Sequence, residues 1–219
     1  MDLDGLLIDS ERYMWGPSMR GAAADQGFDL TDELHNAYMG MGLQRIQKIL
    51  EETFGEKFDF EKFYRRSLEI NREIITRDGL PLMKGAMELL DYLQEKNIYS
   101  CVGTSTRKEM ADFIFEAAGI TNKITKITYG EEVIEGKPSP DIYLKCFNKF
   151  DVKKEESVVY EDSGNGGLSA LNAGIRLILV PDFCVLSEDV LSRAFAVCKD
   201  LTESIDIIDK ENNGMKFNI

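Results

Sequence analysis

The sequence has few of the residues that several classes of functional site require. It contains one histidine, His35, which nearly excludes a catalytic triad or a metal site built on imidazoles. The four cysteines are scattered without a CxxC pair, which favours free thiols over a disulfide or zinc site; they are Cys101, Cys146, Cys184 and Cys198. We find no apolar run near the roughly 18 residues of a membrane span and no signal-peptide segment. We therefore expect a cytoplasmic protein with no membrane partner.

Basic residues are also scarce relative to acidic ones. Lys and Arg number 26 against 39 Asp and Glu, which gives a formal net charge of −13. This balance disfavours nucleic acid as a partner, because there is no cationic excess to displace counterions. A local pocket that contains a metal can still bind an anionic substrate against this field. The hydrophobic content of 43% is that of an ordinary globular protein, and we expect a monomer.

Two patterns of apolar residues divide the chain. From about residue 10 to residue 80 the spacing is helical, as in Phe60, Phe63, Tyr64 and Leu68, and glycines separate the helices. Beyond residue 83, helices alternate with short apolar strands. The expected helices are 85–96, 108–118, 140–147 and 167–173, and the expected strands are 98–103, 124–129, 157–160 and 176–180. This alternation predicts an α/β core with a parallel sheet covered on both faces, and an all-helical insert. We expect the core to comprise residues 1–10 and 81–219, and the insert residues 11–80.

Acidic residues stand where the first strand should end. In open parallel sheets, ligands bind beyond the carboxyl ends of the strands. Asp2 and Asp4 are two carboxylates at a spacing of two, and Gly5 lets the backbone turn sharply beside them. One carboxylate can attack a phosphorus atom while the other exchanges a proton with the leaving group or water. The pattern is short, and a solvated turn is the alternative interpretation.

A second acidic pair, Glu161 and Asp162, follows a short apolar strand. Acidic groups at this position can complete a magnesium shell together with Asp2, because Mg²⁺ prefers oxygen ligands. The alternative is that Asp162 or Ser163 merely caps the next helix.

A lysine and a hydroxyl cluster complete the set of candidates. Pro138 holds Lys137 in an extended conformation at a helix entrance, where its ammonium group can neutralise a phosphoryl oxygen. Thr104 and Ser105 follow the strand 98–103, where a hydroxyl and adjacent backbone N–H groups bind phosphate well. A surface lysine and a helix cap are the respective alternatives.

The order and spacing of these motifs resemble those of the haloacid dehalogenase-like hydrolase superfamily, specifically its β-phosphoglucomutase-like branch with a helical cap. The matching stretches are DLDGLLIDSE, VGTSTR, GKPSPDIYLK and YEDSGNGGLSALNAG. They span the expected core and bracket the insert. The resemblance implies a Rossmann-like parallel sheet with helices on both faces and a cap, residues 11–80, that closes over the site. It also implies a Mg²⁺-dependent enzyme that acts on a small phosphorylated metabolite.

The resemblance further implies a role for each candidate residue. Asp2 would be the nucleophile that forms an aspartyl-phosphate intermediate, and Asp4 would be the general acid/base. Thr104 would hold the phosphoryl group, with Ser105 contributing to substrate binding, and Lys137 would offset negative charge. The metal ligands would be Asp2, Asp4 through its backbone carbonyl, Asp162, and Glu161 either directly or through water.

Two stretches of the cap depart from the pattern of the mutase. Met41, Leu43 and Arg45 lie in the expected specificity loop, where the mutase has a phosphate-binding arginine. Leu43 cannot bind a second phosphate, although Arg45 is nearby, and Met14 stands where many relatives have a histidine. These departures favour a phosphatase acting on a sugar or polyol phosphate. A hexose-phosphate mutase is the alternative enzyme, and a catalytically impaired binding or regulatory protein is the alternative of another class.

The start of the sequence departs from the family as well. Only Met1 precedes Asp2, whereas family members usually carry several apolar residues there, which form the central strand. A parallel sheet depends on its central strand for hydrogen bonds on both sides and for buried side chains. We therefore expect an N-terminally extended form to be more stable than the 219-residue chain.

Overall fold

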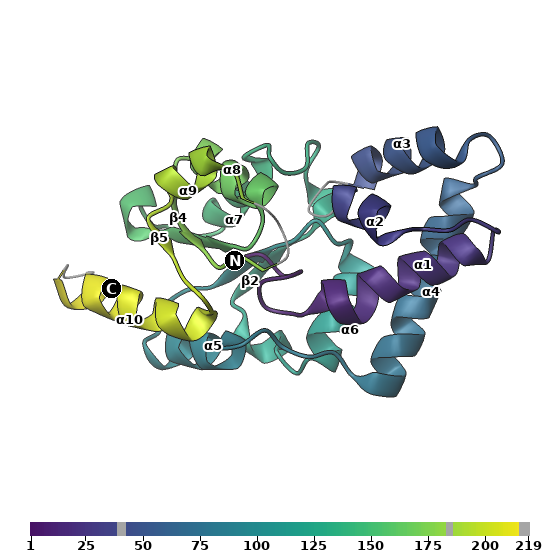
Figure 1. Cartoon of the computed structure of the whole chain (residues 1–219). Helices are drawn as coiled ribbons and strands as arrows, with labels where there is room; N and C mark the ends of the chain where they lie inside the picture. The colour runs from purple at the N-terminus through teal and green to yellow at the C-terminus, as the bar shows by residue number, and fades with distance from the viewer. Residues whose placement is uncertain (39–42, 183–185, 215–219) are drawn as a thin grey trace.

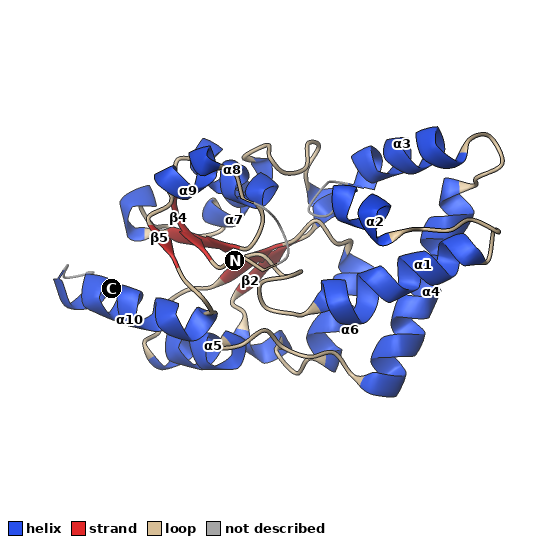
Figure 2. Cartoon of the chain, in the orientation of Figure 1, coloured by secondary structure: helices blue, strands red, loops and turns tan. Residues whose placement is uncertain are grey.

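The computed structural model describes residues 1–38, 43–182 and 186–214. Strands and their covering helices form one side of the molecule, and the helices between residues 11 and 78 form the other (Figures 1 and 2). In the described part of the chain, no helix is both long and apolar enough to cross a membrane.

In its described part, the segment from residue 11 to residue 78 consists of helices joined by loops, as its spacing predicts. A π-helical turn, η1 (Glu11–Trp15), runs directly into α1 (Gly16–Ala24), and then come α2 (Asp32–Tyr38), α3 (Leu43–Phe54) and α4 (Phe60–Asp78). Helix α1 packs along α4 (Figure 1). The four helices bury a hydrophobic cluster of their own, the cap cluster, which comprises Met19, Ala22, Ala23, Leu30, Tyr38, Ile46, Leu50, Phe58, Phe60 and Phe63. This segment therefore has its own source of hydrophobic stabilisation.

In the described part of the chain, five short strands, all paired in parallel, form the sheet. They are β1 (Cys101–Gly103), β2 (Lys126–Thr128), β3 (Val158–Glu161), β4 (Arg176–Leu179) and β5 (Ala196–Val197). Strand β1 pairs with β2, and β4 pairs with β3 on one side and β5 on the other.

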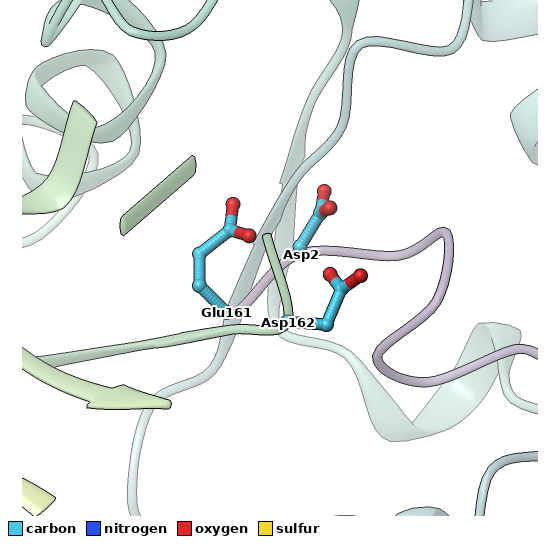
Figure 3. Close-up of side chains that lie close together, drawn as sticks. All are labelled: Asp2, Glu161 and Asp162. Carbon is cyan, nitrogen blue, oxygen red and sulfur yellow. The ribbon is translucent and has the colours of Figure 1, made fainter. Parts of the chain in front are cut away.

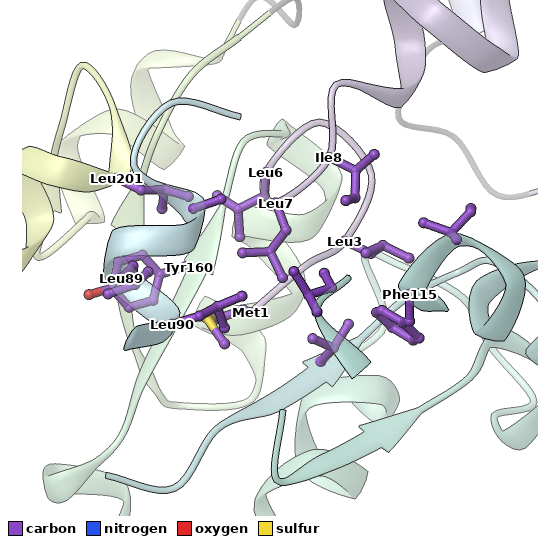
Figure 4. Close-up of a cluster of buried hydrophobic side chains, with 14 of the residues drawn as sticks. Met1, Leu3, Leu6, Leu7, Ile8, Leu89, Leu90, Phe115, Tyr160 and Leu201 are labelled. Carbon is purple, nitrogen blue, oxygen red and sulfur yellow. The ribbon is translucent and has the colours of Figure 1, made fainter. Parts of the chain in front are cut away.

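The first residues of the chain lie between these two groups of strands. The backbone N–H of Asp2 donates to the carbonyl of Tyr160 in β3 at 3.0 Å, and the N–H of Gly103 in β1 donates to the carbonyl of Met1 at 2.9 Å. Met1 and Asp2 thus connect β1 to β3, and the order across the sheet is β2, β1, residues 1–2, β3, β4, β5. The buried side chains of Met1 and Leu3 belong to the same hydrophobic cluster as Tyr160 (Figure 4).

Successive residues of β3 and β4 point to opposite faces of the sheet, as strand geometry requires. Tyr160 and Ile178 join the large cluster, formed with residues 1–8, α5 (Ala86–Glu95), α6 (Lys108–Ala117) and α10 (Leu201–Gly214). Val159 and Leu177 join the small cluster, formed with α7 (Asp141–Phe147), α8 (Gly164–Asn172) and α9 (Glu188–Arg193). Helices therefore cover both faces (Figure 1). The short 3₁₀ turns are η2 (Thr121–Lys123), η3 (Gly130–Glu132) and η4 (Lys154–Glu156).

The predicted α/β architecture, with parallel strands and covering helices, is confirmed. Some element boundaries differ from the predicted ones, because hydrogen bonds at the ends of helices decide where an element begins. Strand β1 begins at Cys101 rather than residue 98, because the N–H of Ile98 still donates to Leu93 in the turn that ends α5. Helix α8 begins at Gly164 rather than residue 167, because Ser163 caps it. Strand β5 and helices α9 and α10 were not predicted. The division at residues 10/11 and 80/81 stays a prediction.

Candidate active site

Most of the predicted site residues gather at the carboxyl edge of the sheet. Asp2 ends the segment that joins the two groups of strands, Thr104 follows β1, Glu161 ends β3 and Asp162 follows it. Lys137 reaches the same edge from the loop before α7. Asp2, Lys137, Glu161 and Asp162 lie close together there, although they come from distant parts of the sequence.

Lys137 bridges two carboxylates inside the protein. Its ammonium nitrogen lies 2.7 Å from Oδ1 of Asp2 and 2.6 Å from Oε1 of Glu161. The three side chains are 7%, 11% and 0% exposed, so the alternative of a surface lysine is wrong. Burial lowers the pKa of Lys137, but the carboxylates of Asp2 and Glu161 outweigh burial and raise it above its usual range. Lys137 is therefore a permanent cation in this pocket.

Three buried carboxylates face one another beside this lysine (Figure 3). Ligand oxygens of Asp2, Glu161 and Asp162 all lie within 4.8 Å of one another. Burial raises the pKa of Asp2 to about 7, and burial with the charges of Glu161 and Asp2 raises the pKa of Asp162 well above its usual range. Oδ1 of Asp162 is buried without a hydrogen-bond partner. When all three carboxyl groups are ionised, the one ammonium group leaves two negative charges, which is the deficit that one divalent cation neutralises.

Glu161 is the most tightly held member of this group. Its Oε1 accepts hydrogen bonds from Lys137 and from the Tyr143 hydroxyl, and its Oε2 accepts from the backbone N–H and the hydroxyl of Ser163. Ser163 is also the N-cap of α8, because its Oγ accepts from the N–H of Gly166 at 3.1 Å. The capping role expected of Asp162 or Ser163 therefore falls to Ser163, which leaves the Asp162 carboxylate available to a ligand.

Two glycines make room for these carboxylates. A Cβ atom at Gly5 would lie 2.5 Å from Oδ2 of Asp162, and the φ of +81° at Gly5 is one that side-chain-bearing residues rarely adopt. A Cβ atom at Gly166 would lie 1.9 Å from Oε1 of Glu161. Both positions require glycine because the chain passes against a carboxylate.

Asp4 lies in a separate set of hydrogen bonds. Its Oδ2 accepts from the Thr106 hydroxyl at 2.8 Å and from the Thr104 hydroxyl at 3.3 Å. Its Oδ1 accepts from the indole N–H of Trp15 at 3.0 Å. The hydroxyl oxygen of Thr104 in turn accepts from the N–H of Thr106 at 3.0 Å. Thr104 is fully buried, and its hydroxyl makes one hydrogen bond to Asp4 and one within its own turn, with the N–H of Thr106. Ser105 is exposed in the turn before α6.

Among the described residues, the predicted cap residues Leu43 and Arg45 take no part in these hydrogen bonds and ion pairs. Met41 lies outside the described residues. Leu43 is half-buried on α3 and packs against the cap cluster, and Arg45 is exposed on the same helix. Met14 is fully buried in the large cluster. Cys101, Cys146 and Cys198 are free thiols, and Cys184 lies outside the described residues.

Sequence reasoning missed four side chains of this region. Trp15 and Thr106 bind Asp4, Tyr143 binds Glu161, and Glu11 lies near the aspartates. Burial, with the charges of Asp4, Asp182, Asp2 and Asp9, raises the pKa of Glu11 to about 7. Thr106 stands inside the quoted motif VGTSTR and could have been found there. The others depend on how helices pack, which no local pattern reveals.

Both the sequence and the fold of this chain are similar to those of known proteins. The chain matches the family model described as haloacid dehalogenase-like hydrolase over residues 1–180. It is 30% identical over 177 residues to the phosphorylated carbohydrates phosphatase of Thermotoga maritima, covering 81% of each chain. It is 31% identical over 193 residues to (DL)-glycerol-3-phosphatase 2 of Arabidopsis thaliana, covering 83% of this chain and 78% of the relative. The crystal structure of β-phosphoglucomutase from Clostridium difficile superposes with a TM-score of 0.76 at 21% identity, covering 97% and 95% of the two chains.

The chain belongs to the haloacid dehalogenase-like hydrolase family. Its fold is that of the β-phosphoglucomutase-like members with cap helices, as the sequence motifs predicted. The prediction of an enzyme of this hydrolase class is likewise confirmed.

Proposed function

We propose that this protein is a divalent-metal-dependent phosphatase that hydrolyses a small phosphorylated metabolite, a sugar or polyol phosphate. The observation that carries the proposal is the buried Asp2 carboxylate, which lies 2.7 Å from the Lys137 ammonium group and within 4.8 Å of two further carboxylates. The names of relatives that act on phosphorylated carbohydrates and on glycerol 3-phosphate support the substrate class.

Asp2 and Asp4 divide the chemistry between them. A carboxylate oxygen of Asp2 attacks the phosphorus, and the bond from phosphorus to the ester oxygen breaks. Protonated Asp4 gives its proton to the departing ester oxygen. Water then attacks the phosphorus of the aspartyl phosphate while Asp4 takes a proton from that water, which releases phosphate and restores Asp2. Lys137 offsets the negative charge of the phosphoryl oxygens, and Thr104 contributes a hydroxyl at the edge of the same site.

The acidic cluster suits a hard divalent cation, and we propose Mg²⁺. Asp2 and Asp162 would hold it with the backbone carbonyl of Asp4, and Glu161 would support it from the adjacent position. The fit rests on the unpartnered buried oxygen of Asp162 and on the two uncompensated negative charges. When bound, the cation supplies positive charge that neutralises the phosphoryl oxygens.

The helices between residues 11 and 80 are proposed to act as a cap over this edge, hinged at residues 10/11 and 80/81. Their separate cap cluster supports this division. Met41, Leu43 and Arg45 are proposed to tune the choice of substrate, with Ser105 at the core side of the entrance. Cap helix η1 already reaches the site, because Trp15 binds Asp4.

The test is release of inorganic phosphate from a panel of sugar and polyol phosphates, with Mg²⁺ and with EDTA. We expect turnover with Mg²⁺, none in EDTA, and none for Asp2→Asn, which lacks the nucleophile. Asp4→Asn should be slower by about 10²–10⁴-fold. Wild-type turnover by Asp2→Asn, or full activity in EDTA, would contradict the proposal.

The same panel addresses the alternatives. Conversion of a hexose 1-phosphate to its 6-phosphate without release of phosphate would instead indicate a mutase. Binding of phosphorylated metabolites without turnover would indicate a catalytically impaired binding protein.

A further inference from the structure

Asp4 receives hydrogen bonds from both sides of the molecule. Thr104 and Thr106, on the core turn after β1, donate to Oδ2 at 3.3 and 2.8 Å. Trp15, at the end of helix η1, donates to Oδ1 at 3.0 Å. Each oxygen of the carboxylate therefore has its own class of donor.

The two classes differ in what they allow. A threonine hydroxyl can donate or accept a hydrogen bond, so Thr104 and Thr106 can bond to Oδ2 in more than one orientation of their hydroxyls. An indole N–H is a donor only. Trp15 therefore holds Oδ1 in one direction, which leaves Oδ2 as the oxygen beside Thr104 and Thr106.

Packing fixes the indole in this position. Trp15 is half-buried and contacts both the cap cluster and the large cluster of the core. Its ring therefore lies at the junction of the two hydrophobic clusters, where it cannot rotate freely. A contact of this kind can set the orientation of a carboxylate without touching substrate.

We propose that Trp15 is a positioning residue for Asp4: its indole N–H holds Oδ1 and so fixes the orientation of the carboxyl group, with Oδ2 beside Thr104 and Thr106. The inference rests on the proposed function, in which Asp4 protonates the leaving group. Helix η1 thereby contributes to proton transfer at the core edge, in addition to any part that the cap has in choosing substrate.

The consequence is a change in how the rate depends on the leaving group. Phenyl phosphate and p-nitrophenyl phosphate have similar rings, but phenolate needs a proton far more than nitrophenolate when it departs. We expect Trp15→Phe, which keeps an aromatic ring and removes the N–H, to increase the ratio of kcat/KM for p-nitrophenyl phosphate over phenyl phosphate by about tenfold. This tenfold effect is smaller than the about 10²–10⁴-fold that general acid–base catalysis contributes, because Trp15→Phe leaves Asp4 itself in place.

A matched packing variant separates positioning from structure. Leu68 on α4 packs half-buried against the large cluster. Leu68→Ala should lower both rates in the same proportion, because it weakens packing between α4 and the core without removing a donor to Asp4. Asp4→Asn should increase the ratio further than Trp15→Phe does.

The hydrogen bond itself can be observed, because the chain contains one tryptophan. In a ¹H–¹⁵N spectrum the single indole resonance should lie downfield in the wild type and move upfield in Asp4→Ala. An unmoved indole resonance, or equal losses on both substrates in Trp15→Phe, would overturn the inference. If the wild type hydrolyses neither substrate, or Asp2→Asn hydrolyses both, the proposed function fails instead.

Discussion

At the scale of single residues, the ion pairs of Lys137 dominate the proposed site. One ammonium group, 7% exposed, faces the carboxylates of Asp2 and Glu161. Such an arrangement is costly to bury and more costly to break, because removing one partner leaves an uncompensated charge. A buried ion pair is weak evidence of a role in stability, so we expect Lys137 to act on a bound ligand.

Lys137→Met tests this point. The substitution keeps an unbranched side chain and removes the charge, so we expect a loss of about 3–5 kcal/mol in the free energy of unfolding of the metal-free protein. Activity should fall by about 10²–10³-fold, as when one electrostatic contact to the transition state is lost. Urea unfolding and phosphate release measure the two effects.

Lys145→Met is the matched control. Lys145 lies 3.5 Å from Glu132 and its side chain is 42% exposed, so its ion pair is worth less than about 1 kcal/mol. Equal losses of stability and activity in the two variants would show that Lys137 has no special place in the site.

At the scale of elements, the start of α8 is fitted to Glu161. Gly166→Ala would place a Cβ atom 1.9 Å from Oε1 of Glu161, whereas Gly164→Ala in the same turn meets only Leu186 at 4.0 Å. We expect Gly166→Ala to be destabilised by about 1–3 kcal/mol, as in overpacked interiors, and to lose activity. Gly164→Ala should change stability by less than about 1 kcal/mol. Thermal melts measure the stability of the two variants, and phosphate release measures their activity. A Gly166→Ala variant as active and stable as Gly164→Ala would contradict the close fit between α8 and Glu161.

Helix α3 provides the test of specificity in the cap. Arg45→Ala is expected to raise KM for the preferred substrate more than it lowers kcat, because it removes a contact made equally in the ground and transition states. Lys48→Ala is the control, since Lys48 is 75% exposed one turn further along the same helix. An unchanged substrate profile for Met41, Leu43 and Arg45 substitutions alike would place specificity elsewhere.

The sequence predicted elements well where a local pattern is enough. The helical spacing before residue 80 and the apolar runs at β1 to β4 are such patterns, and the motifs after them identified the residues that converge at the sheet edge. Strand β5 has two residues and its Val197 is half exposed, so it has no apolar run to detect. The bonds from Trp15 to Asp4 and from Tyr143 to Glu161 depend on tertiary packing, which periodicity does not encode.

At the scale of the whole molecule, buried acids link stability to pH. The pKa values of Asp2 and Glu11 are raised to about 7 by burial first and by neighbouring carboxylates second. In the unfolded chain both groups lose their protons near the ordinary value of about 4. Between about pH 4 and pH 7 the folded protein therefore holds more protons than the unfolded chain. Its free energy of unfolding must fall as pH rises, by up to about 1.4 kcal/mol per pH unit for each group.

Thermal melts in EDTA at pH 5.5 and pH 8 measure this effect, and we expect the higher Tm at pH 5.5. Saturating Mg²⁺ should raise Tm more at pH 8, because a bound cation favours the ionised carboxylates. Asp2→Asn should weaken the dependence on pH, since it removes one of the titrating groups. A Tm in EDTA that rises from pH 5.5 to pH 8 would contradict the assignment.

The net negative charge of the whole chain also bears on how fast a substrate arrives at the sheet edge. A phosphate ester is an anion, and the chain carries a net charge of −13, of which one bound divalent cation offsets only the two excess charges of the facing carboxylates. Diffusional encounter is then slowed by long-range repulsion, which dissolved ions screen over about 8–10 Å near physiological ionic strength. At saturating Mg²⁺, kcat/KM should therefore increase as NaCl is raised from about 10 mM to about 150 mM, while kcat stays constant. Where positive potential attracts an anionic substrate, association becomes slower as salt is added. For this protein we expect the opposite, an increase of kcat/KM with salt.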